Sequence, residues 1–157
     1  MAYANPRVSG DYPGRNCWVA PAEEAAGHSA TADTLLKNAG RFVDCYRFRA
    51  DILDGRGDWT GAQKAYEDAV ALAPDLPPAY WSWGVALLKH GDYVGAEAKL
   101  RAANLRGPHW ADPLKAWGDL LAKQGKAGDA LRKYDEALRY APNWKELKDA
   151  REALAKR

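Results

Sequence analysis

The sequence predicts an all-α protein, a superhelical solenoid built from antiparallel pairs of helices. Three stretches of the 157-residue chain repeat one pattern at a fixed offset of 34 residues. Each stretch has small residues, a large residue, a turn glycine and a closing proline in the same register. The columns are Ala62, Ala96 and Ala130; Ala69, Ala103 and Ala137; Pro74, Pro108 and Pro142; Gly57, Gly91 and Gly125; Tyr66, Leu100 and Tyr134; Ala50, Gly84 and Gly118; Leu53, Leu87 and Leu121. A strict period in this range is typical of stacked helical repeats.

Helical spacing within a unit supports the same prediction. Tyr80, Trp83, Gly84, Leu87 and Leu88 recur on one helix face, and a second face follows in residues 93–104. The glycine between the two helices is expected in a left-handed turn, which is easy for a residue without Cβ. One helix pair cannot bury its apolar face alone, so neighbouring pairs must stack to form a continuous core.

The columns resemble the tetratricopeptide repeat (TPR), in which each unit is a pair of antiparallel helices. The resemblance covers three units, 43–76, 77–110 and 111–144. The strongest match is the second unit, with Tyr80, Trp83, Gly84, Leu87, Gly91, Tyr93, Ala96, Leu100, Ala103 and Pro108. The first unit departs most, because Arg49 stands where Trp83 and Trp117 stand in the next two. The resemblance is specific for fold and weak for function, since the same scaffold serves many unrelated partners.

The C-terminal segment 145–157 is predicted to be a helix that caps the array. Asn143 followed by Glu146 three residues later has the spacing of a capping box. Leu147, Ala150 and Leu154 form one apolar stripe, and the remaining residues are polar. A polar outer face keeps a terminal repeat in solution.

The N-terminal quarter is less regular. Residues 1–20 contain prolines and glycines without periodicity and are predicted to be an irregular segment. Residues 21–42 are predicted to be a degenerate helical half-repeat, with Pro21 in the first helical turn. Gly27 weakens this helix, so two shorter helices are an alternative. The missing partner helix suggests that the chain is the C-terminal part of a longer, bacterial-type TPR protein.

The composition is that of a chain without a strong charge bias. The 23 basic and 21 acidic residues give a net charge of +2, so neither nucleic acid nor an acidic membrane surface is indicated as a partner. No apolar run approaches the roughly 20 residues of a membrane span. No secretory signal is visible after Met1, and a cytoplasmic location is expected.

The reactive side chains indicate no catalytic or metal site. Cys17 and Cys45 leave two alternatives, a disulfide or a pair of reduced thiols, and reduced thiols are expected in a cytoplasmic protein. No Cys-x-x-Cys motif or close Cys/His pair is present, so neither metal nor cofactor is expected. His28, His90 and His109 are scattered, and no nucleophile, base and acid converge, so the chain is not predicted to be an enzyme.

Tryptophan is unusually frequent, with seven in the chain. Trp83 and Trp117 occupy a large-residue column and are predicted to pack in the core. Trp110 and Trp144 lie 34 residues apart, where one unit passes to the next, and are predicted to wedge helix junctions. Trp18 has no predicted position.

The resemblance implies that the first helices of the units line a concave groove in which ligands bind. Carrying the family's groove-facing columns onto this chain yields nine candidate partner-binding residues. They are Arg47, Asp51, Asp54, Trp81, Val85, Leu88, Lys115, Asp119 and Lys123. Trp81, Val85 and Leu88 are expected to form an exposed apolar stripe between mixed charges, which often marks a binding site. The expected function is therefore a non-enzymatic scaffold that binds a peptide or helix of a partner protein.

Alternatives to this function stay open. Residues 1–40 could cover the stripe, a second copy of the chain could bury it, or the chain could be an architectural or self-association module of a larger protein. One known use of the fold is excluded, the two-carboxylate clamp for chaperone tails. The clamp positions hold Arg47, Asp51, Ser82, Asp112 and Ala116, and only Arg47 keeps the required chemistry. Asp51 and Asp112 would repel a carboxylate.

Overall fold

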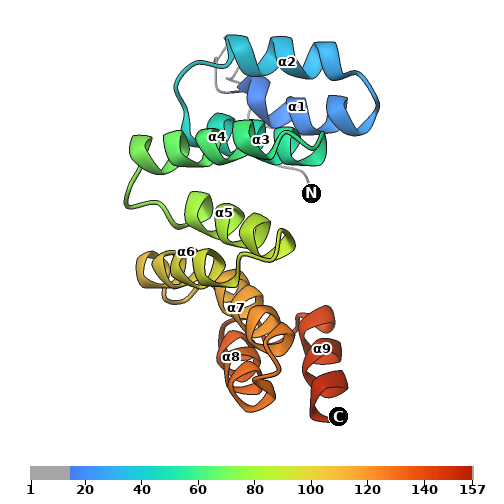
Figure 1. The fold of residues 1–157 in the computed structure, drawn as a ribbon, viewed down its shortest axis with the longest axis vertical. Coiled ribbons are helices and arrows are strands. Elements are labelled where there is room, and N and C mark those ends of the chain that lie inside the picture. Colours follow the sequence, from blue (N-terminus) through green and yellow to red (C-terminus); the bar gives the residue numbers. More distant parts are fainter. Residues whose placement is uncertain (1–14, 157) are drawn as a thin grey trace, which may run out of the picture. The chain divides into compact units, whose positions relative to one another are not determined.

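The computed structural model describes residues 15–156, and this part of the chain contains nine α-helices (Figure 1). The chain divides into two compact units at Ala73, and we call the described residues on either side the N-terminal unit (15–73) and the C-terminal unit (74–156). The N-terminal unit contains α1 (Arg15–Ala25), α2 (Ser29–Asn38), α3 (Val43–Gly55) and α4 (Trp59–Leu72). The C-terminal unit contains α5 (Pro77–Lys89), α6 (Tyr93–Arg106), α7 (Ala111–Lys123), α8 (Ala127–Tyr140) and α9 (Lys145–Ala155).

Helix hairpins are the building blocks of both units. In the N-terminal unit α1 packs on α2, α3 packs on α4, and α1 also packs on α3. In the C-terminal unit α5 pairs with α6 and α7 with α8, and the pairs stack through α6 and α7. The all-α prediction is confirmed for the described residues.

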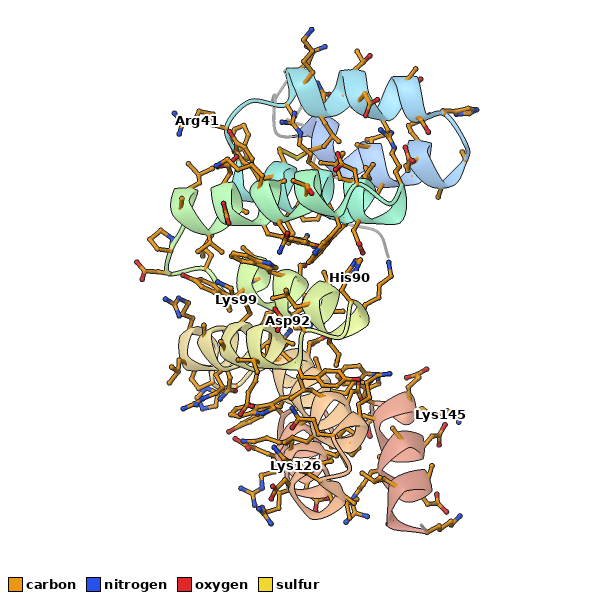
Figure 2. All side chains as sticks on the ribbon, in the orientation of Figure 1. Arg41, His90, Asp92, Lys99, Lys126 and Lys145 are labelled. Carbon is orange, nitrogen blue, oxygen red and sulfur yellow. A yellow bond between two sulfur atoms is a disulfide. The ribbon has the colours of Figure 1, made fainter. Side chains whose placement is uncertain are left out.

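Glycines make the turns inside the periodic hairpins. Gly57, Gly91 and Gly125 have φ angles of 85°, 80° and 76°, in the left-handed region that side chains disfavour. The predicted role of this column is thus confirmed. The carboxylate of Asp92 then caps α6 by accepting from the backbone N of Gly95 at 2.9 Å (Figure 2).

The repeated columns form the cores of the hairpins. The three columns of small residues, which begin with Ala50, Ala62 and Ala69, are buried in every repeat. The large column of Tyr66, Leu100 and Tyr134 is buried as well. Gly84 and Gly118 lie on the first helices where Leu100 and Tyr134 approach most closely. Small residues here let the two helices of a pair come together around a large side chain.

The N-terminal segment differs from the prediction. Residues 15–20 are helical and belong to α1, which encloses Pro21 instead of starting at it; residues 1–14 of the predicted irregular segment lie outside the described residues. The half-repeat prediction is also wrong, because α1 and α2 form a complete hairpin that turns at Gly27, with φ of 82°. The partner helix whose absence suggested a longer protein is α1.

The C-terminal helix α9 has the predicted apolar stripe but not the predicted cap. Leu147, Ala150 and Leu154 pack in a cluster with α7 and α8, as expected. The N-cap residue, however, is Trp144, and no side chain caps the helix. The backbone of Trp144 is extended, and its side chain packs against the same cluster.

A disulfide joins Cys17 in α1 to Cys45 in α3, with their Cα atoms 5.0 Å apart. The expectation of reduced thiols is therefore wrong for this structure. Both cysteines are buried in an apolar cluster that includes Ala20, Leu36 and Ile52. The sequence left this disulfide open as an alternative but gave no reason to favour it, because Cys17 fell in the segment predicted to be irregular.

Candidate binding surface

The nine candidate residues lie on three helices, and the structure distributes them between the two units. Arg47, Asp51 and Asp54 are on α3 in the N-terminal unit. Two sets lie on α5 and α7 in the C-terminal unit, and these helices contact each other. They are Trp81, Val85 and Leu88 on α5, and Lys115, Asp119 and Lys123 on α7.

The α3 set is held in place by its own neighbours. The Arg47 guanidinium lies 3.5 Å from Asp44 and 3.7 Å from Asp51, and it stacks 4.3 Å above the ring of Phe48. The hydroxyl of Tyr66, which comes from α4, donates a hydrogen bond of 2.6 Å to Asp51. The carboxylate of Asp51 is thus oriented by a cation on one side and a phenol on the other.

The α7 set repeats this arrangement. Lys115 Nζ lies 2.6 Å from Asp119, and the hydroxyl of Tyr134 in α8 donates a 2.7 Å hydrogen bond to the same carboxylate. We call each such set of a cation, an aspartate four residues later and a tyrosine on the second helix a clamp triad: Arg47–Asp51–Tyr66 and Lys115–Asp119–Tyr134. Both aspartates were predicted to meet a partner, but each already has a structural role between its two helices.

Packing and hydrogen bonding in the clamp triads shift the pKa values of Asp51, Tyr66 and Tyr134. The pKa of Asp51 is raised, mainly because packing removes water from the carboxylate, and the hydrogen bond from Tyr66 and the charge of Arg47 only partly oppose this. The pKa values of Tyr66 and Tyr134 are both raised, first by burial and then by their aspartates. Both tyrosines therefore keep their protons and act as hydrogen-bond donors at neutral pH.

Replacing Tyr66 by Phe is expected to lower the free energy of unfolding by about 1.5 kcal/mol, because the hydrogen bond to a charged carboxylate is lost. The matched control is Tyr93→Phe, since Tyr93 is exposed and its hydroxyl makes no described hydrogen bond, and little change is expected. Urea unfolding followed by circular dichroism measures both. Equal stabilities of Tyr66→Phe and the wild type would contradict the triad.

The same triads predict a decrease in stability at alkaline pH. A tyrosine in the unfolded chain ionises near pH 10, whereas folded Tyr66 and Tyr134 hold their protons to higher pH. The unfolded state therefore binds fewer protons above about pH 10, and stability falls there by up to about 1.4 kcal/mol per pH unit for each tyrosine. Urea unfolding between pH 8 and 11 should show this fall, and Tyr66→Phe should make it shallower. An unchanged slope in that variant would contradict the raised pKa.

In the second repeat, residues 77–110, the positions of the clamp triad hold three apolar residues, Trp81, Val85 and Leu100. Leu100 is fully buried, whereas the Val85 side chain is 38% exposed. Trp81 is half-buried and packs against Trp110, with ring centroids 5.3 Å apart and planes inclined at 58°. Trp110 is the N-cap residue of α7, so this aromatic pair joins α5 to α7 at a helix junction, as predicted for Trp110. The second repeat thus has a partly exposed apolar site at the positions where the first and third repeats have a polar clamp triad.

The prediction of an exposed stripe is wrong for Leu88, which is only 9% exposed. The reason is its angular position on α5, relative to Gly84, which faces Leu100 in the core. At 3.6 residues per turn, Leu88 lies about 40° from Gly84, Trp81 about 60° and Val85 about 100°. Exposure increases in this order, so Leu88 belongs to the edge of the core.

Two aromatic residues were not among the candidates. Trp18 on α1 is 62% exposed, and its ring meets that of Phe48 edge-on at 5.3 Å between centroids. Phe48 shares its column with Ser82 and Ala116, both of which occupy positions of the chaperone-tail clamp, so the signal for Phe48 was present. No signal could have placed Trp18, because α1 lies outside the 34-residue period.

The structure indicates neither a metal site nor a membrane span in its described part. Across residues 15–156, His, Cys, Asp and Glu side chains form no group of three that could hold a metal ion. None of the helices in these residues combines the length and apolarity that crossing a bilayer requires.

Comparisons with known proteins identify the repeats. The tetratricopeptide repeat family model matches residues 49–108. The fold is similar to a thermophilic TPR protein of Thermus thermophilus, with a TM-score of 0.80 and 21% identity over 98% of this chain and 84% of that one. It is also similar to YrrB, described as a TPR protein with an unusual peptide-binding site, with a TM-score of 0.71 and 18% identity over 87% of this chain and 73% of that one.

A plant protein has a similar fold as well. The Arabidopsis OM64 TPR domain matches with a TM-score of 0.67 and 19% identity over 73% of this chain and 94% of that domain. None of the curated protein sequences matches this one. Identities this low indicate a common fold and not a common function. Residues 49–108 therefore match the tetratricopeptide repeat family, and the helix pairs of the described chain have the all-α fold of TPR proteins.

Proposed function

We propose that this chain is a protein-interaction scaffold whose C-terminal unit binds a peptide or helix of a partner protein across α5 and α7. TPR folds in general mediate interactions between proteins, which supports the broad class. We also propose that the repeat units have the boundaries 43–76, 77–110 and 111–144. The observation that carries the binding proposal is the apolar site of Trp81, Val85 and Trp110, which stands where two other units have a polar clamp triad.

The site favours a partner segment with an apolar or aromatic anchor. Val85 and the Trp81–Trp110 pair offer a partly exposed apolar contact on a rigid helix, where an anchor would bind with little ordering of the protein. Next to it on α7, Asp119 is neutralised by Lys115. Lys123 is exposed and has no described hydrogen-bond or ion-pair partner. An acidic group on the partner would therefore meet Lys123, and rim charges of this kind set orientation and encounter rate.

The test starts from peptides selected by phage display against the full chain, with their affinities measured by calorimetry. Trp81→Ala is expected to weaken binding at least about tenfold, because it removes the central aromatic contact. Val94→Ala is the matched control, since Val94 on α6 is 83% exposed and lies outside the site. Circular dichroism should show unchanged helicity in both variants. If Trp81→Ala unfolds the protein, or if both variants bind equally, the proposed site is wrong.

Self-association remains the competing function. The exposed side chains of Trp18 and Val19 on α1 are the observation that favours it, because a second copy could cover them. Light scattering over a concentration series distinguishes the two functions. A monomer that binds selected peptides supports the scaffold proposal, whereas a dimer that loses peptide binding on association supports the architectural module.

The location of the protein is the remaining part of this proposal. Disulfides persist in oxidising compartments and are rare in the cytosol. The Cys17–Cys45 bond therefore favours an oxidising compartment over the cytoplasm that the sequence suggested. The test is to alkylate free thiols while the cells are lysed, before any reductant is added. Labelling of both cysteines would favour the cytoplasm.

A further inference from the structure

A cavity of about 260 Å³ lies in the N-terminal unit, between the end of α2, the connection that follows it, and α3. Lys37, Arg41 and Arg49 line it, together with Leu36 and the ring of Tyr46. Arg41 lies on the connection between α2 and α3 (Figure 2). No carboxylate is among the lining residues. The cavity is therefore a basic hollow with an apolar wall, and we call it the basic cavity.

The basic cavity collects the lysines and arginines that lack a carboxylate partner. Among residues 16–73, Arg47, Arg56 and Lys64 all form ion pairs with aspartate or glutamate. The described interactions of Lys37 and Arg41 include no hydrogen bond and no ion pair, and Arg49 only donates to the carbonyl of Leu36 at 3.4 Å. The three cations of residues 16–73 without a described carboxylate partner, Lys37, Arg41 and Arg49, therefore all belong to the basic cavity.

Neighbouring carboxylates do not neutralise this charge. An adjoining hollow shares Arg41 and Tyr46 and contains Asp68, but Lys64 pairs with Asp68 at 2.7 Å. Another shares Lys37 and Arg49 and contains Asp33, which Arg56 binds at 2.9 Å. Both acidic groups are already paired.

A structural reason for these cations is the C-terminal end of α2. The last carbonyls of a helix carry a partial negative charge equivalent to about half an elementary charge, and Arg49 contacts one of them. The three full positive charges of Lys37, Arg41 and Arg49 are more than is needed to balance this partial charge. Like charges around one hollow repel each other, so the arrangement is most favourable when an anion occupies it.

We propose that the basic cavity binds the phosphate group of a small free ligand, inorganic phosphate or a small phosphate ester. Phosphate carries more negative charge than a carboxylate and offers more acceptor oxygens, which matches two guanidinium groups and an ammonium. The apolar wall of Leu36 and Tyr46 suits a short organic group attached to the phosphate. This site uses no residue of the proposed peptide-binding site, and neither proposal depends on the other.

The experiment titrates the full-length chain by calorimetry at constant ionic strength. The probes are inorganic phosphate, glycerol 3-phosphate, a phosphoserine peptide and acetate. Wild type should bind phosphate or the ester and should bind acetate much more weakly. The double variant Lys37→Gln/Arg41→Gln should lose at least about tenfold in affinity, since two charge-assisted contacts are removed.

The matched control removes the same charge elsewhere. Arg139 and Lys148 are exposed residues of the C-terminal unit without described side-chain partners, so Arg139→Gln/Lys148→Gln should bind phosphate within about twofold of wild type. Amide shifts on phosphate addition should concentrate in residues 37–49. If the double variant is misfolded, Arg41→Gln alone takes its place and should still weaken binding.

Several outcomes would overturn the proposal. They are no saturable binding of either small phosphate by wild type, equal loss in the control, equal affinity for acetate, or amide shifts outside the cavity. Binding of the phosphoserine peptide without binding of either small phosphate would indicate a protein ligand instead, and would also overturn it.

Discussion

Reducing the Cys17–Cys45 disulfide is expected to lower the free energy of unfolding of the N-terminal unit by about 3 to 4 kcal/mol. The bond closes a loop with a sequence separation of 28, and opening a loop of this length returns conformational entropy to the unfolded chain. The bond also cross-links α1 to α3, the first helix of the α3–α4 hairpin. The N-terminal hairpin is the part of the fold that depends on this link, because α2 is only ten residues long and its N-cap residue His28 makes no side-chain cap.

Hydrogen exchange on the full chain, with and without reductant, measures this effect helix by helix. The amides of α1, α2 and α3 should exchange faster after reduction, while those of α9 serve as the internal reference. The double variant Cys17→Ala/Cys45→Ala should behave like the reduced protein, which separates loss of the bond from side effects of the reductant. Exchange that is the same in the oxidised protein and in the variant would show that the disulfide contributes nothing to stability.

The periodic hairpins were predictable because their columns encode packing directly. Ala62, Ala96 and Ala130 are buried where helices touch, and the glycines at 57, 91 and 125 carry the left-handed turns. Each of these roles admits few residue types, so the same type recurs at the same position. A fold defined by such local rules can be read from one sequence.

The N-terminal hairpin was missed because its spacing differs. Gly27 makes the same left-handed turn as Gly57, but it stands 30 residues earlier instead of 34. Pro21, which normally marks a helix start, lies inside α1. The hairpin is held by a disulfide and an apolar cluster, and neither follows the period of the repeats.

The candidate surface shows what the columns contained and what they did not. Tyrosine at 66 and 134 accompanies aspartate at 51 and 119, while leucine at 100 accompanies valine at 85. This joint change indicates a contact between the two helices of a unit, and it was visible in the sequence. The burial of Leu88 was also visible, because Leu88 recurs at helical spacing with Gly84 and Leu87, but the groove columns carried over from the family placed it in the exposed stripe.

Replacing Gly118 by Ala is expected to destabilise the C-terminal unit by roughly 2 to 3 kcal/mol, although alanine is the better helix former by about 1 kcal/mol. A Cβ atom at this position of α7 would lie 2.5 Å from Cδ1 of Tyr134 and 3.3 Å from the carbonyl oxygen of Ala130. The tyrosine ring cannot move away easily, because it is buried and its hydroxyl is bound to Asp119. The substitution therefore separates α7 from α8 or breaks the clamp triad.

The same substitution at Gly128 is the matched control. Gly128 lies in the first turn of α8, and a Cβ atom there would meet no atom within 4 Å. Gly128→Ala should therefore stabilise the protein by up to about 1 kcal/mol, through helix propensity alone. Urea unfolding of the two variants should give changes of opposite sign. Changes of the same sign would mean that close approach of α7 and α8 at Gly118 does not limit which residue fits there.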